Sequence, residues 1–255
     1  MTRRGTLWLV VSVVALAGFA ILLPHSPVYV TNLFSGQDRY GGHSRRYWID
    51  NLDNSDARVR QEAIFALGAC GSDSGEAVPA LAAILAGDAE GKVRSEAALA
   101  LMKMHPASRT ALPELSQALQ DEEPGVRMYA ALALFRMGRE ARSAVPALIK
   151  ALGDEGNQTR VGSFFFSVRE AIAMTLGRVS AGTAEGVPAL TGVLTGKATL
   201  SLQRAVVRAL GDIGAEARPA APQLRKILAD AGPVLRDDVH EALQKIEGGP
   251  AGTGG

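Results

Sequence analysis

The stretch "AVPALIKALGD" (Ala144–Asp154) decides the fold of this chain, because the chain repeats it. Closely similar stretches are "AVPALAAILAGD" (Ala77–Asp88) and "GVPALTGVLTGK" (Gly186–Lys197). In each copy a proline is followed by apolar residues at helical spacing. Proline fits the first turn of a helix, where its missing N–H has no partner to lose. The repetition therefore predicts several structural units that each begin with the same kind of helix.

A second phrase follows these stretches and recurs six times. The copies begin at Val59, Val93, Val126, Val168, Leu202 and Leu235. The steps between them are 33 or 34 residues, with one step of 42. Position 9 of every copy is leucine, and positions 1, 5, 8, 9 and 12 are small or apolar, which is the spacing of one helical face. Each unit is thus predicted to be a helix pair that buries its apolar face by stacking on its neighbours.

The order V-P-A-L, then V-R, then A-L-G-x-[IVM]-G resembles HEAT repeats, especially the bacterial repeats related to those of bilin lyases. The resemblance covers residues 44–247. It implies an all-α solenoid of about six helix pairs, with a concave surface that binds other proteins. The first unit lacks the proline and carries Trp48 instead of an aliphatic residue, which is typical of a capping repeat.

The segments that flank the repeats have different compositions. Residues 6–23 are 18 residues without a charge, and as a helix they span about 27 Å, so we predict a transmembrane signal anchor. Arg3 and Arg4 precede it, which predicts that residues 1–5 stay in the cytoplasm and the bulk of the chain lies outside. The alternative is a cleaved signal peptide and a secreted protein. Residues 24–43 are predicted to be a linker, and residues 248–255 a disordered Gly-rich tail.

Several classes of function are disfavoured by composition. Basic and acidic residues nearly balance in the repeat region, which argues against a nucleic-acid partner. The four histidines are scattered, and the single cysteine, Cys70, has no nearby histidine with metal-ligand spacing. No P-loop or nucleophile motif is present. We therefore expect no catalytic residues, no metal and no cofactor.

Positions 3, 7 and 10 of the second phrase point away from the predicted buried face. In a stack of this kind that direction is the concave surface. The predicted partner-binding strip consists of Phe65, Leu99, Met102, Met128, Leu132, Phe135, Met174, Arg204 and Arg208. Methionine adapts its shape to irregular partners, so the strip favours a groove for a peptide or helix. The alternative is that curvature packs these residues against neighbouring repeats.

Two further features concern the edges of the stack. The 42-residue step places extra residues between the paired helices of the fourth unit, including Phe164, Phe165 and Phe166. These rings either form an exposed partner-binding anchor or pack inward. Arginines that follow position 1 are predicted to brace the repeats through carboxylates or helix C-termini. They are Arg60, Arg94, Arg127, Arg169 and Arg236.

Taken together, the sequence predicts a membrane-anchored scaffold or adaptor that binds a protein or peptide through its concave face. One alternative is an accessory subunit of an enzyme, similar to the HEAT-repeat proteins of bilin lyases. The other is a purely structural envelope protein.

Overall fold

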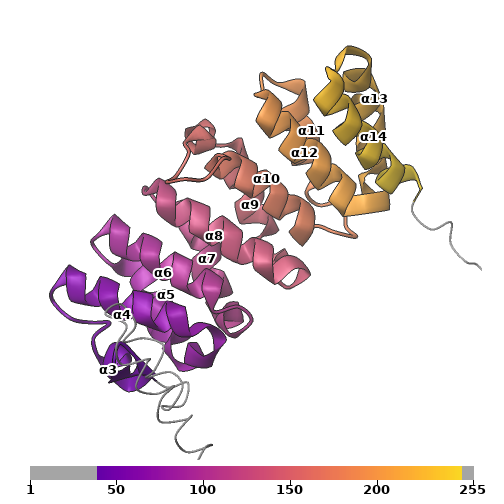
Figure 1. Ribbon diagram of the computed structural model, residues 1–255. Coiled ribbons are helices and arrows are strands. Elements are labelled where there is room, and N and C mark those ends of the chain that lie inside the picture. The colour runs from indigo at the N-terminus through magenta and orange to yellow at the C-terminus, as the bar shows by residue number, and fades with distance from the viewer. Residues whose placement is uncertain (1–38, 249–255) are drawn as a thin grey trace, which may run out of the picture.

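The computed structural model describes residues 39–248, in which six helix pairs stack along one direction (Figure 1). The first helices of the pairs are α3 (Arg45–Asp50), α5 (Val78–Gly87), α7 (Leu112–Ala118), α9 (Val145–Gly153), α11 (Val187–Thr195) and α13 (Ala221–Asp230). The second helices are α4 (Ala57–Cys70), α6 (Gly91–Lys103), α8 (Pro124–Met137), α10 (Val168–Val179), α12 (Leu200–Ile213) and α14 (Pro233–Glu247). The predicted all-α solenoid is confirmed.

Short 3-10 helices connect most repeats, and local sequence explains where the α-helices begin and end. The turns that connect repeats are η1 (Gly71–Ala77), η2 (Ala107–Ala111), η3 (Gly138–Ala144) and η5 (Gly214–Ala220). A further 3-10 helix, η4 (Glu155–Gln158), lies inside the fourth repeat, between α9 and α10. The helix that follows η1, η2, η3 or η5 has proline in its first turn, as does α11. Gly138 ends α8 with a φ of 58°, a conformation that is costly for residues with a Cβ.

The second phrase lies in the second helix of every pair, and its apolar face forms one continuous core. The leucine at position 9 is completely buried in the first five copies and 9% exposed in the last, Leu243. Trp48 of the first unit is also buried, at 4% exposure. The predicted register is therefore correct in every repeat.

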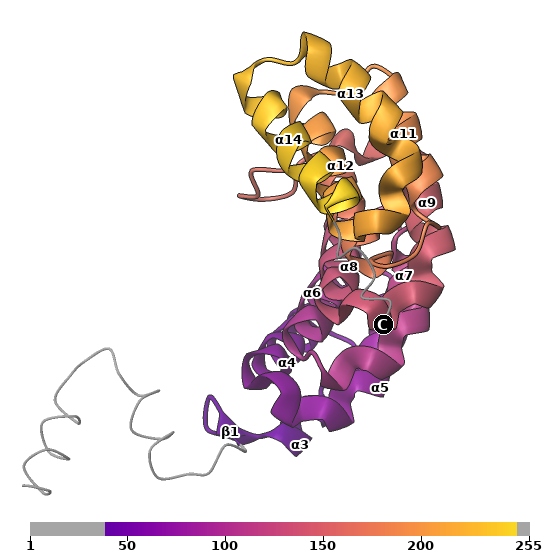
Figure 2. The ribbon, with the colours of Figure 1, turned by 90° about the vertical axis from the view of Figure 1, so that its right-hand side faces the viewer.

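The two kinds of helix form two layers, and the stack is curved. Figure 2 shows the second helices on the concave side and α5, α7, α9, α11 and α13 on the convex side. Neighbouring second helices approach each other closely: a Cβ added to Gly177 of α10 would lie 2.5 Å from the Cα of Ala209 in α12. The second helices therefore supply the residues that line the inner surface.

A small hairpin precedes the first repeat. Strands β1 (Arg39–Tyr40) and β2 (His43–Ser44) pair antiparallel, and the indole N–H of Trp48 donates to the carbonyl oxygen of Tyr40 at 3.1 Å. The last residues of the predicted linker are thus ordered against the first repeat.

The predicted anchor (residues 6–23), most of the linker and all but the first residue of the C-terminal tail lie outside the described residues. Between residues 39 and 248, no helix combines the length and the apolar character needed to cross a membrane.

Candidate functional site

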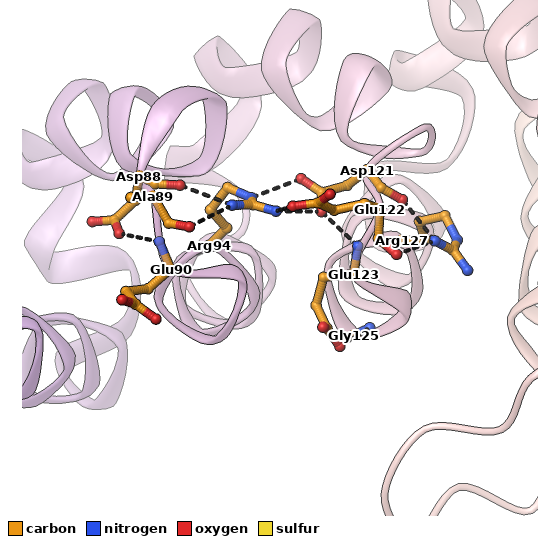
Figure 3. A network of polar contacts seen from close by, with 9 residues as sticks. All are labelled: Asp88, Ala89, Glu90, Arg94, Asp121, Glu122, Glu123, Gly125 and Arg127. Carbon is orange, nitrogen blue, oxygen red and sulfur yellow. Dashed lines mark hydrogen bonds and ion pairs between the residues drawn. The ribbon is translucent and has the colours of Figure 1, made fainter.

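Arginines at position 2 of the second helices join consecutive repeats along one edge of the stack (Figure 3). The guanidinium of Arg94 donates to both carboxylate oxygens of Asp121 in the next repeat, at 2.8 and 2.9 Å. It also donates to the carbonyl oxygens of Asp88 and Ala89, which precede its own helix. Asp121 in turn accepts a hydrogen bond from the backbone N–H of Glu123. The buried side chain of Arg94 therefore joins the turn before α6 to the turn before α8.

The same arrangement recurs at Arg60, whose guanidinium binds both carboxylate oxygens of Asp88 at 2.7 and 3.0 Å. Burial by itself raises the pKa of Asp88. The hydrogen bonds from Arg60 and from the backbone N–H of Glu90 outweigh burial, so the pKa lies below its ordinary value. The predicted bracing role is confirmed for Arg60 and Arg94.

In the fourth repeat the arginine of this edge binds an asparagine that the sequence did not single out, although Asp154 stands where the earlier repeats have Asp88 and Asp121. Arg127 donates to the side-chain oxygen of Asn157 at 2.6 Å, and the Asn157 amide donates to the carbonyl oxygen of Ala151 at 2.9 Å. Asn157 is completely buried. Arg127 is therefore also a brace between repeats. Arg169 and Arg236 instead donate to carbonyl oxygens of their own repeats, those of Leu152 and Ala231.

The predicted concave strip is only partly accessible. Phe65 is 56% exposed, and five of its members are half-buried: Leu99, Met102, Leu132, Phe135 and Met174. Met128, in contrast, is completely buried, so for this residue the alternative of packing against a neighbouring repeat holds and an exposed binding role does not. Position 3 of the second phrase faces the next second helix. In the fourth copy this position is Glu170 of α10, which accepts a hydrogen bond from Ser201 of α12. An apolar side chain at this position is therefore covered by its neighbour.

The accessible part of the strip includes a groove between α4 and α6. Phe65, Ile64 and Leu99 contribute apolar surface, and the volume is about 400 Å³. Charged residues of both signs surround it: Arg58, Glu62, Glu96 and Lys103. The ammonium of Lys103 lies 5.6 Å from the centre of the Phe65 ring, a cation–π distance. Such a groove fits an apolar side chain that is flanked by polar groups.

Burial has the largest influence on the Glu96 carboxyl and raises its pKa, whereas the charge of nearby Lys92 lowers this pKa by a smaller amount. The carboxyl is therefore partly desolvated before any partner binds. A hydrogen-bond donor on a partner would find it available at this side of the groove.

The two arginines at the C-terminal end of the strip have an intramolecular partner. Arg204 and Arg208 donate to the carboxylate of Asp238 in α14, at 2.6 and 2.9 Å. The Asp238 side chain is 7% exposed. Burial raises its pKa, but the combined lowering by the two arginines is larger, so the pKa of Asp238 lies below the ordinary value. These arginines therefore join α12 to α14.

The insertion in the fourth repeat exposes one of its three phenylalanines and partly buries the other two. Phe165 is 93% exposed. Phe164 and Phe166 are half-buried and contact each other, with ring centres 5.3 Å apart, and Phe164 also contacts Tyr129 at 6.0 Å. Each of the two alternatives thus describes part of the triplet.

Within residues 39–248, no group of three or more histidine, cysteine, aspartate or glutamate side chains is placed to hold a metal ion.

The HEAT-repeat family matches residues 46–107, 105–164 and 160–244, and the chain belongs to this family. A comparison with curated proteins found no match.

Three similar solved structures illustrate the range of this fold. The complex of CpcE and CpcF of phycocyanin lyase from Nostoc sp. PCC7120 contains a chain with 29% identity, a TM-score of 0.55, and coverage of 80% of this chain and 77% of that one. An engineered protein has 21% identity and a TM-score of 0.60, covering 80% and 96%. A designed armadillo repeat protein in complex with the peptide (KR)4 has 19% identity and a TM-score of 0.57, covering 78% and 98%.

Proposed function

We propose that this protein is a scaffold or adaptor that holds a protein or peptide segment against its concave face. The observation that carries the proposal is Phe65, a large aromatic side chain that is 56% exposed beside the groove between α4 and α6. Water-exposed aromatic surface next to a groove is typical of a binding site and contributes nothing to solubility. The peptide complex of the designed armadillo repeat protein supports this use of a similar fold.

The proposed activity is binding without catalysis. The groove is open, its charged groups are of mixed sign, and its apolar surface comes from Phe65 and Leu99. These features suit an extended segment that inserts one side chain.

The proposed location is the outer face of a membrane, with residues 6–23 as an uncleaved anchor and residues 1–5 in the cytoplasm. The support is the uncharged stretch preceded by Arg3 and Arg4. Protease added to intact cells should then degrade residues 44–247. Protection until the membrane is opened would overturn this orientation, and release into the medium would favour the cleaved alternative.

Site-specific photocrosslinking in the cells that make the protein tests the concave site. A benzophenone amino acid replaces Phe65 in one variant and Lys150, an exposed residue of α9, in the control. We expect a light-dependent adduct of discrete mass at position 65 and none at position 150. The absence of an adduct at position 65, or equal adducts at both positions, would overturn the proposal.

A matched substitution separates the groove from the rest of the strip. Phe65→Ser combined with Leu99→Ser removes apolar surface from the groove, and a photocrosslinker at Arg58 on its rim then reports occupancy. We expect the adduct at position 58 to decrease about tenfold relative to the chain with an intact groove. An unchanged adduct would show that the groove is not the binding site.

A second candidate function is an accessory subunit of an enzyme. The observation in its favour is the 29% identity with a chain of the phycocyanin lyase complex over 80% of this chain. Purification of the full chain under mild conditions distinguishes the two functions. Co-purification of an enzyme whose activity falls when this chain is removed would favour the second candidate.

A further inference from the structure

Three arginines that form no ion pair with a carboxylate of residues 39–248 lie at the edge where the second helices end, opposite the edge that Arg94 braces. Arg136 and Arg178 occupy position 11 of the third and fourth copies of the second phrase, and Arg139 follows in η3. Lys103 holds the same position in the second copy. The second to fourth copies therefore place basic residues at this position, whereas the fifth copy places Asp212 there.

These arginines line a hollow with a volume of about 540 Å³, whose other residues include Gly138, Ala181 and Asp212. The Arg178 guanidinium lies 4.8 Å from the centre of the Phe135 ring, a cation–π contact that orients it. Arg139 extends toward the next repeat, since its guanidinium lies 3.7 Å from where a Cβ on Gly182 would be. The hollow thus adjoins Phe135 of the concave strip.

Among the described residues, the three arginines of the hollow outnumber its two carboxylates. Of these carboxylates, Glu140 pairs with Arg109 at 2.5 Å, and Asp212 lies 3.7 Å from the ammonium of Lys245, whose closer partner is Glu241 at 2.8 Å. Between residues 39 and 248, no carboxylate forms an ion pair with Arg136, Arg139 or Arg178. Arg60 and Arg94, in contrast, each hold a carboxylate in two hydrogen bonds.

The neighbouring histidine is consistent with a positive local potential. The pKa of His105 is lowered first by burial and then by the charges of Arg109 and Arg136, against the opposite effect of Glu140. Part of this lowering is electrostatic, because Arg109 and Arg136 disfavour a protonated imidazole beside them.

We propose that the hollow lined by Arg136, Arg139 and Arg178 binds a glutamate- or aspartate-rich segment of the partner protein. This inference rests on the proposed function and specifies the chemistry of the partner. Guanidinium groups bind carboxylates through two parallel hydrogen bonds, and Phe135 beside the hollow accepts an apolar residue next in sequence. A nucleic acid requires a wider basic surface, whereas acidic and basic residues nearly balance over the repeat region as a whole.

The test uses the full chain in non-ionic detergent and a fluorescein-labelled peptide of about eight residues in which glutamate and leucine alternate. Fluorescence anisotropy should show saturable binding that weakens strongly as salt is raised, because exposed charges are screened. The same peptide with glutamine for glutamate should bind at least about tenfold more weakly. Equal binding of the two peptides would overturn the proposal.

The variant that tests the site carries Arg136→Gln, Arg139→Gln and Arg178→Gln. The matched control carries Lys150→Gln, Arg218→Gln and Lys226→Gln, which remove the same charge from exposed residues elsewhere in the stack. We expect the first variant to lose about tenfold or more in affinity and the control to bind as the unmodified chain does. Equal losses in both would show a non-specific effect of net charge and overturn the assignment.

A charge-preserving variant keeps the test decisive if the glutamine variant does not fold. Arg136→Lys, Arg139→Lys and Arg178→Lys retain the charge but not the planar fork, so binding should weaken yet stay salt-dependent. Complete insensitivity to both triple changes would sink the inference. A positive crosslink at position 65 together with no binding of the acidic peptide would leave the proposed function standing and remove only this inference. The absence of that crosslink would count against the function itself.

Discussion

At the residue scale, Arg94 has the most demanding environment among the bracing arginines. Its side chain is 10% exposed, and its guanidinium donates hydrogen bonds to the carboxylate of Asp121 and to two backbone carbonyl oxygens. Arg94→Ala leaves a buried carboxylate without its cation, so the free energy of unfolding should fall by about 3–5 kcal/mol. Urea denaturation followed by circular dichroism measures this change.

The matched control for that prediction is Arg46→Ala. Arg46 pairs with Asp50 on the surface of α3, and both side chains are more than half exposed. An exposed pair within one helix contributes about 0.3–0.5 kcal/mol. If the two substitutions lowered stability equally, the brace at Arg94 would be no more than a surface contact.

Asp238 makes the stability of the C-terminal repeats depend on pH. Its pKa in the folded chain is lowered, because Arg204 and Arg208 outweigh the opposing effect of burial. A lowered pKa stabilises the fold above the ordinary aspartate value of about 4, and this contribution disappears as the pH falls below it. Asp238→Asn should therefore be less stable than the unmodified chain at pH 7, and the difference should shrink below about pH 4. The urea midpoints of both chains, measured across that pH range, test this prediction. A difference between the midpoints that did not change with pH would contradict it.

At the element scale, the close approach of α10 and α12 depends on a glycine. A Cβ at Gly177 would lie 2.5 Å from the Cα and 2.6 Å from the Cβ of Ala209, whereas a Cβ at Gly192 in α11 would meet no atom within 4 Å. Gly177→Ala should destabilise the fold by about 1–3 kcal/mol through overpacking. Gly192→Ala should stabilise it by about 0.5–1 kcal/mol, because alanine favours helices. Thermal unfolding of both variants checks the contrast, which equal shifts in one direction would refute.

The helices and their core faces follow from the sequence because six copies of one phrase repeat the same helical period. The period does not specify how closely neighbouring helices pack. The period alone therefore places Met128 on the face that points away from the core, although α8 packs closely enough on its neighbours to bury it completely. The same limitation applies to the insertion: its place in the fourth repeat follows from the spacing, but the separation of exposed Phe165 from half-buried Phe164 and Phe166 depends on the loop conformation.

At the scale of the whole molecule, the candidate sites depend on contacts between repeats that no single repeat reveals. The sequence identified Phe65 and the bracing role of Arg94 because both follow from position within the phrase. It missed the arginine hollow because position 11 alone resembles a solvated surface. The signal was present in Arg136 and Arg178, which are aligned bases of consecutive copies. Their significance depends on Glu140 and Asp212 forming no ion pair with them among the described residues, and only the tertiary arrangement shows this.

In a stack where each repeat contacts only its neighbours, a destabilising substitution should loosen mainly the repeats next to it, so its effect depends on its position. Leu134 is completely buried in α8, with repeats on both sides, whereas Leu243 of α14 is 9% exposed in the last described repeat. Leu134→Ala should cost about 2–5 kcal/mol and Leu243→Ala an amount near the lower end of that range. Hydrogen exchange read by mass spectrometry should show faster exchange on both sides of α8 in the first variant. In the second, the faster exchange should be confined to α12–α14. Exchange that rises uniformly along the chain in both variants would mean that the repeats unfold as one unit and that nearest-neighbour coupling does not limit the damage.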